Sequence, residues 1–361
     1  MAFRSLFRLL GAAAVLTAST LTAAEWRTNF HTDACQPKFQ EYAKFHKAAR
    51  GVPGARYLVY SCTTGNCAGL GDRIRATMML LDKAINLNRV LLIDWRHPSP
   101  ITEYLEPNAI DWRPVPSVPG KTLDIHWWLP TNRSTPAPWR DQHEFNRSID
   151  NATTVRVHTN DGYMVKGTED GYTADTRSFH SCLFNMLYRP SAMVTDSAAQ
   201  ELYKMYHGII PRRFIAVHLR MGGLEGEEKA LDRHQGARDI TVVSAAVEFA
   251  VTLATKRGID PTVTPVAFIS DNRHLRFMLR NEFITGAVSP SAPNAKHIDI
   301  GSNSTPAHFV SEFVEVRILS QADCLLHSLS GFSAMAVWWT NISCHHTMMQ
   351  ALADMETKMS H

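Results

Sequence analysis

Short apolar runs alternate with segments of helical spacing along most of the chain. In the second half, three apolar runs have the length of strands buried on both faces of a parallel sheet, at 213–220, 265–270 and 322–327. A further strand is predicted near 297–300, and helical spacing predicts helices at about 240–256, 273–281, 308–320 and 333–340. This alternation predicts a doubly wound α/β domain.

The first half contains a similar unit. Apolar runs at 56–61 and 89–94 flank a helical segment at about 72–86, which predicts a βαβ unit with a glycine-rich first turn. Helical spacing also occurs at 33–50 and 197–207. Residues 130–180 are expected to form an irregular excursion with a few short strands, such as Thr154 to His158.

Polar residues follow the predicted strands of the second half. His218 and Arg220 end the first strand, Asp271 ends the second, and a run of serines from Ser328 ends the third. Open parallel sheets bind ligands at the edge where the carboxyl ends of the strands meet. A guanidinium at that edge fits phosphate oxygens, so the pattern predicts a binding site for an anionic ligand.

The length of 361 residues and a hydrophobic content of 45% suffice for two domains. We expect a signal peptide or anchor at 1–24, an N-terminal α/β domain at 25–208, a C-terminal Rossmann-like domain at 209–345 and a tail at 346–361. The formal charge is only +3, and the sequence has no arginine-rich arm. The composition therefore argues against a nucleic-acid-binding protein.

The N-terminus has the pattern of a secretory leader. Arg4 and Arg8 precede an uncharged run from Leu9 to Ala24 that ends in small residues. A cleaved signal peptide and a type II membrane anchor both fit this run. Either one predicts the lumen of the Golgi or endoplasmic reticulum, or secretion, with membrane contact only through the possible anchor.

Two other features agree with an oxidising, glycosylating compartment. Acceptor patterns for N-glycosylation begin at Asn132, Asn146, Asn151, Asn303 and Asn341. The six cysteines are an even number and allow one to three disulfides, whose pairing the sequence leaves open.

The glycine-rich turn at Gly65 to Gly71 also fits a competing interpretation. Thr-Gly-x-x-x-Gly-x-Gly with an acid at the end of the next strand is how short-chain dehydrogenases hold NAD. Those enzymes also need a tyrosine and a lysine four residues apart on one helix face. None of the nine tyrosines has a lysine four residues later, which argues against that class.

The motifs taken together resemble the superfamily of α1,6- and protein O-fucosyltransferases. The segment 216–220 is similar to its His-x-Arg motif, 68–73 to its glycine-rich first loop, 267–271 to its strand ending in Asp, and 319–333 to its third motif. The resemblance covers roughly residues 55–95 and 210–340. It implies a GT-B fold, in which two Rossmann-like, doubly wound domains face a cleft.

The resemblance also implies a site for GDP-fucose in the C-terminal domain. Arg220 would neutralise the departing diphosphate, His218 would assist at the nucleotide, and Asp271 would read the guanosine. The remaining residues of the expected nucleotide site are Gly69, Gly71, Ser328, Ser330, Phe332 and Ser333.

Two carboxylates are candidates for the catalytic base. Glu228 lies ten residues after His218, which is the distance found in the α1,6 branch, although the acidic stretch around it also fits a solvated loop. Asp72 is the second candidate, and it is equally suited to cap the helix that it opens. The protein O-fucosylating branch often has Asn near the Glu228 position, so the acceptor class stays open.

No metal or other cofactor is expected. The sequence contains no Asp-x-Asp pair, and the adjacent His345 and His346 have no Glu or Cys at an obvious ligand spacing. The sequence therefore predicts an inverting, metal-independent transferase that moves fucose from GDP-fucose to a glycan or glycoprotein. The alternatives are a nucleotide-sugar or glycan-binding module without turnover, and the dehydrogenase-like protein.

Overall fold

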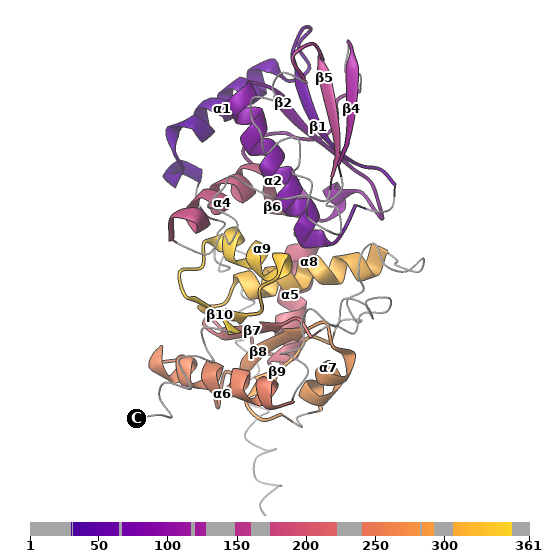
Figure 1. The fold of residues 1–361 in the computed structure, drawn as a ribbon. Coiled ribbons are helices and arrows are strands. Elements are labelled where there is room, and N and C mark those ends of the chain that lie inside the picture. Colours follow the sequence, from indigo (N-terminus) through magenta and orange to yellow (C-terminus); the bar gives the residue numbers. More distant parts are fainter. Residues whose placement is uncertain are drawn as a thin grey trace, which may run out of the picture.

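The protein is described here by a computed structural model covering residues 30, 32–64, 67–116, 120–127, 149–159, 174–221, 240–281, 284–291 and 306–348. Figure 1 shows two parallel sheets at opposite ends of an elongated molecule, with helices packed between them. The predicted leader and the candidate base Glu228 lie outside the described residues.

The first sheet is four-stranded and parallel, in the order β2-β1-β5-β4. Its strands are β1 (Tyr57–Cys62), β2 (Val90–Trp95), β4 (Thr122–Trp127) and β5 (Thr154–Thr159). Alternate side chains of β1 and β2 point to opposite faces. One set packs near Phe45 and Ala49 of α1 (Pro37–Ala49), and the other enters the centre of the molecule.

The second sheet has the order β11-β10-β7-β8-β9, and its pairs are also parallel. Its strands are β7 (Ile215–Leu219), β8 (Val266–Ser270), β9 (Ala287–Val288), β10 (Cys324–His327) and β11 (His345–Thr347). The outer face packs against α6 (Ile240–Lys256) and α7 (Arg273–Arg280) through residues such as Val217, Phe268 and Leu326. The inner face carries Ala216 and Leu325 toward the centre.

A layer of helices separates the two sheets (Figure 1). It consists of α2 (Leu70–Leu87), α4 (Ala174–Leu187), α5 (Ala192–Met205), α8 (Pro306–Ser320) and α9 (Gly331–Thr340). One continuous hydrophobic cluster includes these helices together with side chains from both sheets, among them Leu58 of β1 and Ala216 of β7. This shared core fixes the two sheets relative to each other, because a close-packed interior resists sliding.

Three short elements complete the described chain. Two are the 3₁₀ turns η3 (Thr32–Ala34) and η4 (Ile101–Glu103). The third is a small antiparallel pair of β3 (Leu105–Pro107) with β6 (Tyr188–Pro190).

The structure confirms the predicted strands that are continuous apolar runs, and it corrects several other expectations. Helix α4 begins at Ala174, although residues 130–180 were expected to be irregular. The helix expected at 197–207 begins at Ala192, because Ser191 caps it by accepting a hydrogen bond from the Val194 amide. The strand expected near 297–300 lies outside the described residues.

His345 and His346 were expected to be surface and structural features. They are partly buried and belong to β11, which pairs with β10. Asn341, an expected glycan acceptor, ends α9 in a left-handed conformation, and its side-chain oxygen accepts a hydrogen bond from Arg177 at 2.9 Å.

All six cysteines are paired, as Cys35–Cys182, Cys62–Cys67 and Cys324–Cys344. The first pair ties the segment before α1 to α4 across a sequence separation of 147 residues. Within the described part of the chain, no helix has the length and apolar character needed to cross a bilayer.

Removing the long-range disulfide is expected to cost more stability than removing the short-range one. In the chain-entropy model, closing a loop of 147 residues contributes about 5 kcal/mol, and closing one of 5 residues contributes about 2 kcal/mol. Cys35→Ser with Cys182→Ser should therefore lower the midpoint of chemical unfolding more than Cys62→Ser with Cys67→Ser. An equal or reversed order would contradict this entropic account.

Candidate functional site

The candidate site lies where the carboxyl ends of β7, β8 and β10 meet the first turn of α9. His218 and His327 are register partners on β7 and β10. His218 lies on the same face of β7 as Ala216, so it points inward to the helical layer that contains α9. The site is therefore built on the inner edge of the second sheet.

A hydrogen-bond network holds the imidazole of His218. Its Nδ1 lies 2.6 Å from Oγ of Ser333, and the Ser333 hydroxyl donates to the carbonyl of Ser328 at 3.1 Å. With the hydroxyl proton used in this way, the network assigns the His218 proton to Nδ1 and leaves Nε2 as an acceptor. The ring of Phe332 stacks on the imidazole with centroids 5.0 Å apart.

Burial lowers the pKa of His218 to about 3, and the positive charge of Arg220 and the neighbouring His327 and Arg276 act in the same direction. Burial likewise lowers the pKa of His327 to about 4. Both imidazoles are therefore neutral near pH 7. The positive charge at this edge comes from arginine.

Arg220 follows β7 directly and its side chain is 24% exposed. Its backbone amide donates to Oγ of Ser328 at 3.1 Å, and its guanidinium lies 4.0 Å from the carboxylate of Asp271. The other carboxylate oxygen of Asp271 accepts from the amide of Met221 at 2.7 Å. Asp271 therefore holds the backbone after Arg220 through the Met221 amide, and it also places a negative charge near the Arg220 guanidinium.

The first turn of α9 faces this edge. Ser330 is the N-cap, and its Oγ accepts from the amide of Phe332 at 3.2 Å. The partial positive charge of a helix N-terminus suits anionic ligands, and here it is combined with the guanidinium of Arg220 from the adjacent strand.

The first half of the chain reaches the same place through α2. A Cβ built on Gly71 would lie 2.5 Å from the carbonyl carbon of Gly331 and 2.9 Å from the Phe332 amide nitrogen. The backbones of α2 and α9 are therefore in direct contact at this point. Gly71 must be glycine, because even a methyl group would force the α2 and α9 N-termini apart, and a Cβ on Gly331 would make a tight contact of 3.0 Å with Cα of Gly71.

The loop before α2 is held by an arginine that the sequence did not single out. Arg73 is fully buried, donates to the carbonyls of Ala68 at 2.7 Å and His97 at 2.5 Å, and lies over the ring of Trp95. Gly69 is the N-cap of α2. The predicted loop residues Gly69 and Gly71 thus sit on a fixed turn.

Asp72 does not cap α2, contrary to one of the two expectations for it. Its carboxylate instead pairs with Arg75 one turn later, at 2.6 Å. The Arg75 guanidinium also lies beside Gly331, 3.1 Å from where a Cβ of that residue would be. A candidate base that is ion-paired must lose or share this partner before it accepts a proton.

The described candidate residues form one continuous chain of contacts, apart from Gly69 and Asp72, which flank it on α2. The contacts run from Gly71 through the first turn of α9 to His218, then through Ser333 and Ser328 to Arg220, and end at Asp271. Sequence reasoning placed these residues on separate strand ends, and the fold brings them together.

Sequence reasoning did not identify the charged residues behind the site, Arg73, Arg75, Arg276 and Glu315. For Arg75, the spacing of three residues from Asp72 was an available signal. The buried arginines carry no such signal, because an isolated arginine in a helical pattern is usually exposed.

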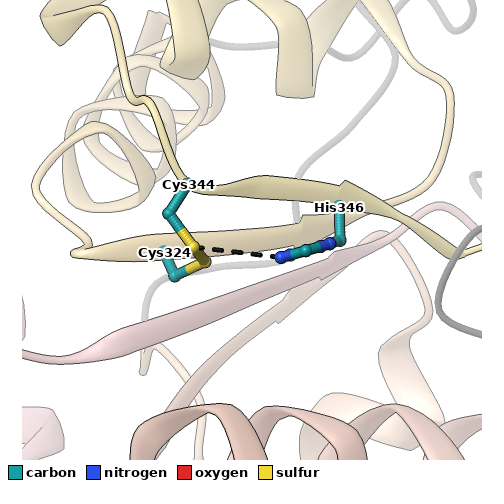
Figure 2. A group of neighbouring side chains, drawn as sticks. All are labelled: Cys324, Cys344 and His346. Atoms are coloured by element: carbon teal, nitrogen blue, oxygen red, sulfur yellow. Dashed lines mark hydrogen bonds between the residues drawn. A yellow bond between two sulfur atoms is a disulfide. The ribbon is translucent and has the colours of Figure 1, made fainter. Parts of the chain in front are cut away.

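One group among the described residues has the geometry of metal ligands. Cys324, Cys344 and His346 place their ligand atoms within 4.8 Å of one another (Figure 2). The two sulfurs form a disulfide, and the imidazole Nε2 lies 3.9 Å from Sγ of Cys344. Since a disulfide offers no thiolate, this oxidised group does not provide a zinc site.

Comparison with known proteins gives a likeness at the level of fold. No model of a known family matches the sequence, and no curated protein does. Among solved structures, a mutant of the fucosyltransferase FUT1 of Arabidopsis thaliana in complex with GDP matches with a TM-score of 0.50 and 16% identity, over 84% of this chain and 76% of that chain.

Two structures of POFUT1 match at lower scores. The complex with GDP has a TM-score of 0.48 and 13% identity, and the complex with GDP-fucose has 0.49 and 12%. Each covers 82% of this chain and 99% of the other. The match to FUT1, together with the two parallel sheets, shows that this chain has a GT-B-like α/β fold.

Replacement of Gly71 tests the contact between the two halves. Gly71→Ala should cost about 1–3 kcal/mol of stability, the usual cost of overpacking, and should also weaken the GDP binding that we propose below, because α9 shifts. Gly54→Ala is the control, since Gly54 has a φ of +83° and no neighbour within 4 Å. It should lose stability through backbone strain and keep its GDP affinity. Equal GDP affinity in the two variants would contradict the role of the contact.

The pH dependence of stability tests the neutral state of His218. Its pKa falls from 6.5 in the unfolded chain to about 3 in the folded protein, so only the unfolded state takes up a proton between these values. The stability held above pH 6.5 should be lost as pH falls, by up to about 1.4 kcal/mol per unit from this group. Chemical unfolding at pH 4–7 should show a shallower loss for His218→Gln. Parallel profiles would show that folding does not lower the pKa of His218.

Proposed function

We propose that this protein is a fucosyltransferase that transfers fucose from GDP-fucose to a glycan or glycoprotein. The observation that carries the proposal is the chain of contacts from Gly71 to Asp271. It joins the glycine-rich loop, the His-x-Arg segment and the serine-rich turn at one edge of a GT-B-like fold. The FUT1 structure that shares the fold contains GDP.

The proposed reaction inverts the anomeric carbon. A hydroxyl oxygen of the acceptor attacks this carbon from the side opposite the diphosphate, the bond to the β-phosphate oxygen breaks, and the hydroxyl proton passes to a base. GDP leaves with the bonding electron pair, so negative charge grows on its phosphate. We propose that the guanidinium of Arg220, which lies at this edge of the sheet, and the N-terminus of α9 stabilise that charge.

No step of this proposal requires a metal ion, because Arg220 supplies the positive charge that a bound cation supplies in other transferases. Turnover of GDP-fucose with a panel of glycans and glycopeptides should therefore release GDP in the presence of EDTA. Release only with added manganese would contradict the metal-free mechanism. Binding without turnover would favour a non-catalytic module, and stronger thermal stabilisation by NAD than by GDP would favour the dehydrogenase class.

We also propose that the protein works in the secretory lumen. The pairing of all six cysteines agrees with an oxidising compartment, as does the predicted leader at 1–24.

Arg220 and Asp271 should give different kinetic signatures. Arg220→Ala loses an interaction that strengthens as the bond breaks, so kcat should fall about 100- to 1,000-fold. Arg220→Lys should recover only part, because an ammonium lacks the planar fork. Asp271→Asn keeps an oxygen for the Met221 amide but loses the charge proposed to bind guanine, so it should mainly raise KM for GDP-fucose. Wild-type turnover in folded Arg220→Ala would remove the proposed role of Arg220.

The identity of the base is tested by two isosteric variants. Glu228→Gln should abolish turnover if Glu228 accepts the proton, and Asp72→Asn should then have the smaller effect because Asp72 is paired with Arg75. The pH profile of kcat/KM should lose its acidic limb only in the variant that lacks the base. Retained turnover in Glu228→Gln with loss in Asp72→Asn would assign the base to α2 instead.

A further inference from the structure

A buried ion pair lies directly behind the candidate site. Arg276 of α7 donates from its two terminal nitrogens to the two carboxylate oxygens of Glu315 of α8, at 2.5 and 2.8 Å. Both side chains are only 1% exposed. A buried pair of this kind is a poor source of stability, since well-packed apolar residues of similar volume are often as good. The geometry of this ion pair is therefore better explained by the part of the structure that the pair holds in position.

The third donor of Arg276 points at the end of β8. Its Nε donates to the carbonyl of Ser270, the last residue of that strand. The Ser270 hydroxyl in turn accepts from the amide of Asn272 at 3.1 Å, and Asn272 caps α7 by accepting from the Leu275 amide at 3.0 Å. The residues on both sides of Asp271 are thus fixed by hydrogen bonds, and Arg276 anchors the first of them.

Asp271 transmits this anchoring to Arg220. Its carboxylate accepts from the Met221 amide at 2.7 Å and faces the Arg220 guanidinium at 4.0 Å. A shift of the Ser270 carbonyl would move Asp271, and the segment that carries Arg220 would follow. The route from Glu315 to Arg220 consists of hydrogen bonds and charge contacts between described residues, joined by the backbone between Ser270 and Asp271.

We infer that Arg276 and Glu315 form a positioning unit that holds Asp271, and through it Arg220, in the geometry that binds the nucleotide diphosphate. The inference rests on the proposed function, and neither residue touches the substrate. A planar guanidinium is required, because two of its nitrogens must bind a carboxylate while the third donates to a backbone carbonyl. Lysine retains the charge and loses this geometry.

The test uses GDP binding measured by calorimetry on the full chain, together with the melting temperature of each variant. Arg276→Met with Glu315→Leu removes both charges and keeps the volume, so the fold should survive with a similar melting temperature. The Kd for GDP should nevertheless rise about tenfold or more. Arg276→Lys, which remains informative if the double variant fails to fold, should also raise the Kd several-fold.

Arg317→Met is the matched control, since Arg317 is a buried arginine on the same helix as Glu315. Its guanidinium lies over the ring of Trp339, and one of its nitrogens is 3.5 Å from Oγ of Ser320. This variant should lower the melting temperature and leave the Kd for GDP unchanged. An equal rise in Kd for Arg317→Met would show a general effect of core damage and would overturn the inference.

A double-mutant cycle with Asp271→Ala tests the route, because this variant removes both the bond to the Met221 amide and the charge near Arg220. If Arg276 acts through Asp271, then Arg276→Lys should add little to the Kd once Asp271→Ala is present. Fully additive effects would overturn the inference, and so would a wild-type Kd in both Arg276 variants. Wild-type protein that does not bind GDP would instead overturn the proposed function, on which the inference depends.

Discussion

The backbone contact between Gly71 and Gly331 is the constraint on which the arrangement depends. Each residue opens a helix, α2 in the first half of the chain and α9 in the second. With no side chain at either position, the two helix N-termini meet directly, and the glycine-rich loop lies against the turn that carries Ser330 and Phe332. A bulkier residue at either position would separate the loop from the phosphate-binding edge that we propose.

Charge at this junction is distributed in a way that suits an anionic ligand. Burial keeps His218 neutral, so the imidazole can serve as a hydrogen-bonding and stacking surface beside Ser333 and Phe332. The positively charged guanidinium of Arg220 lies 4.0 Å from the negatively charged carboxylate of Asp271. The Asp271 carboxylate also binds the Met221 amide, so the guanidinium is held in place before a ligand arrives. Such preorganisation avoids reorganisation during the reaction.

The sequence was sufficient to predict the three central strands of the second sheet and its polar edge, whereas the short edge strands β9 and β11 were not predicted. Strands β7, β8 and β10 are continuous apolar runs, as expected for a parallel sheet covered on both faces, and His218, Arg220, Asp271 and Ser328 lie at their carboxyl ends. The period-2 geometry of strands places His218 on the inner face of β7 with Ala216, and Arg220 follows the end of the strand.

Other features follow from tertiary contacts that leave no local pattern. The helix α4 follows a region rich in Pro, Asn and Ser, and its stability comes from packing against α9 and from the Cys35–Cys182 bond. Arg276 and Glu315 look like surface charges in the sequence, and only the fold shows that they face each other. The contact of Gly71 with Gly331 joins residues of opposite halves, which no sequence period reveals.

A crystal structure of the protein with GDP tests the central claim most directly. The account predicts that the diphosphate lies within hydrogen-bonding distance of the Arg220 guanidinium and the first-turn amides of α9, with the guanine near Asp271. The contact between Gly71 and Gly331 should be retained. A nucleotide bound elsewhere, with Arg220 still directed only at Asp271, would contradict it.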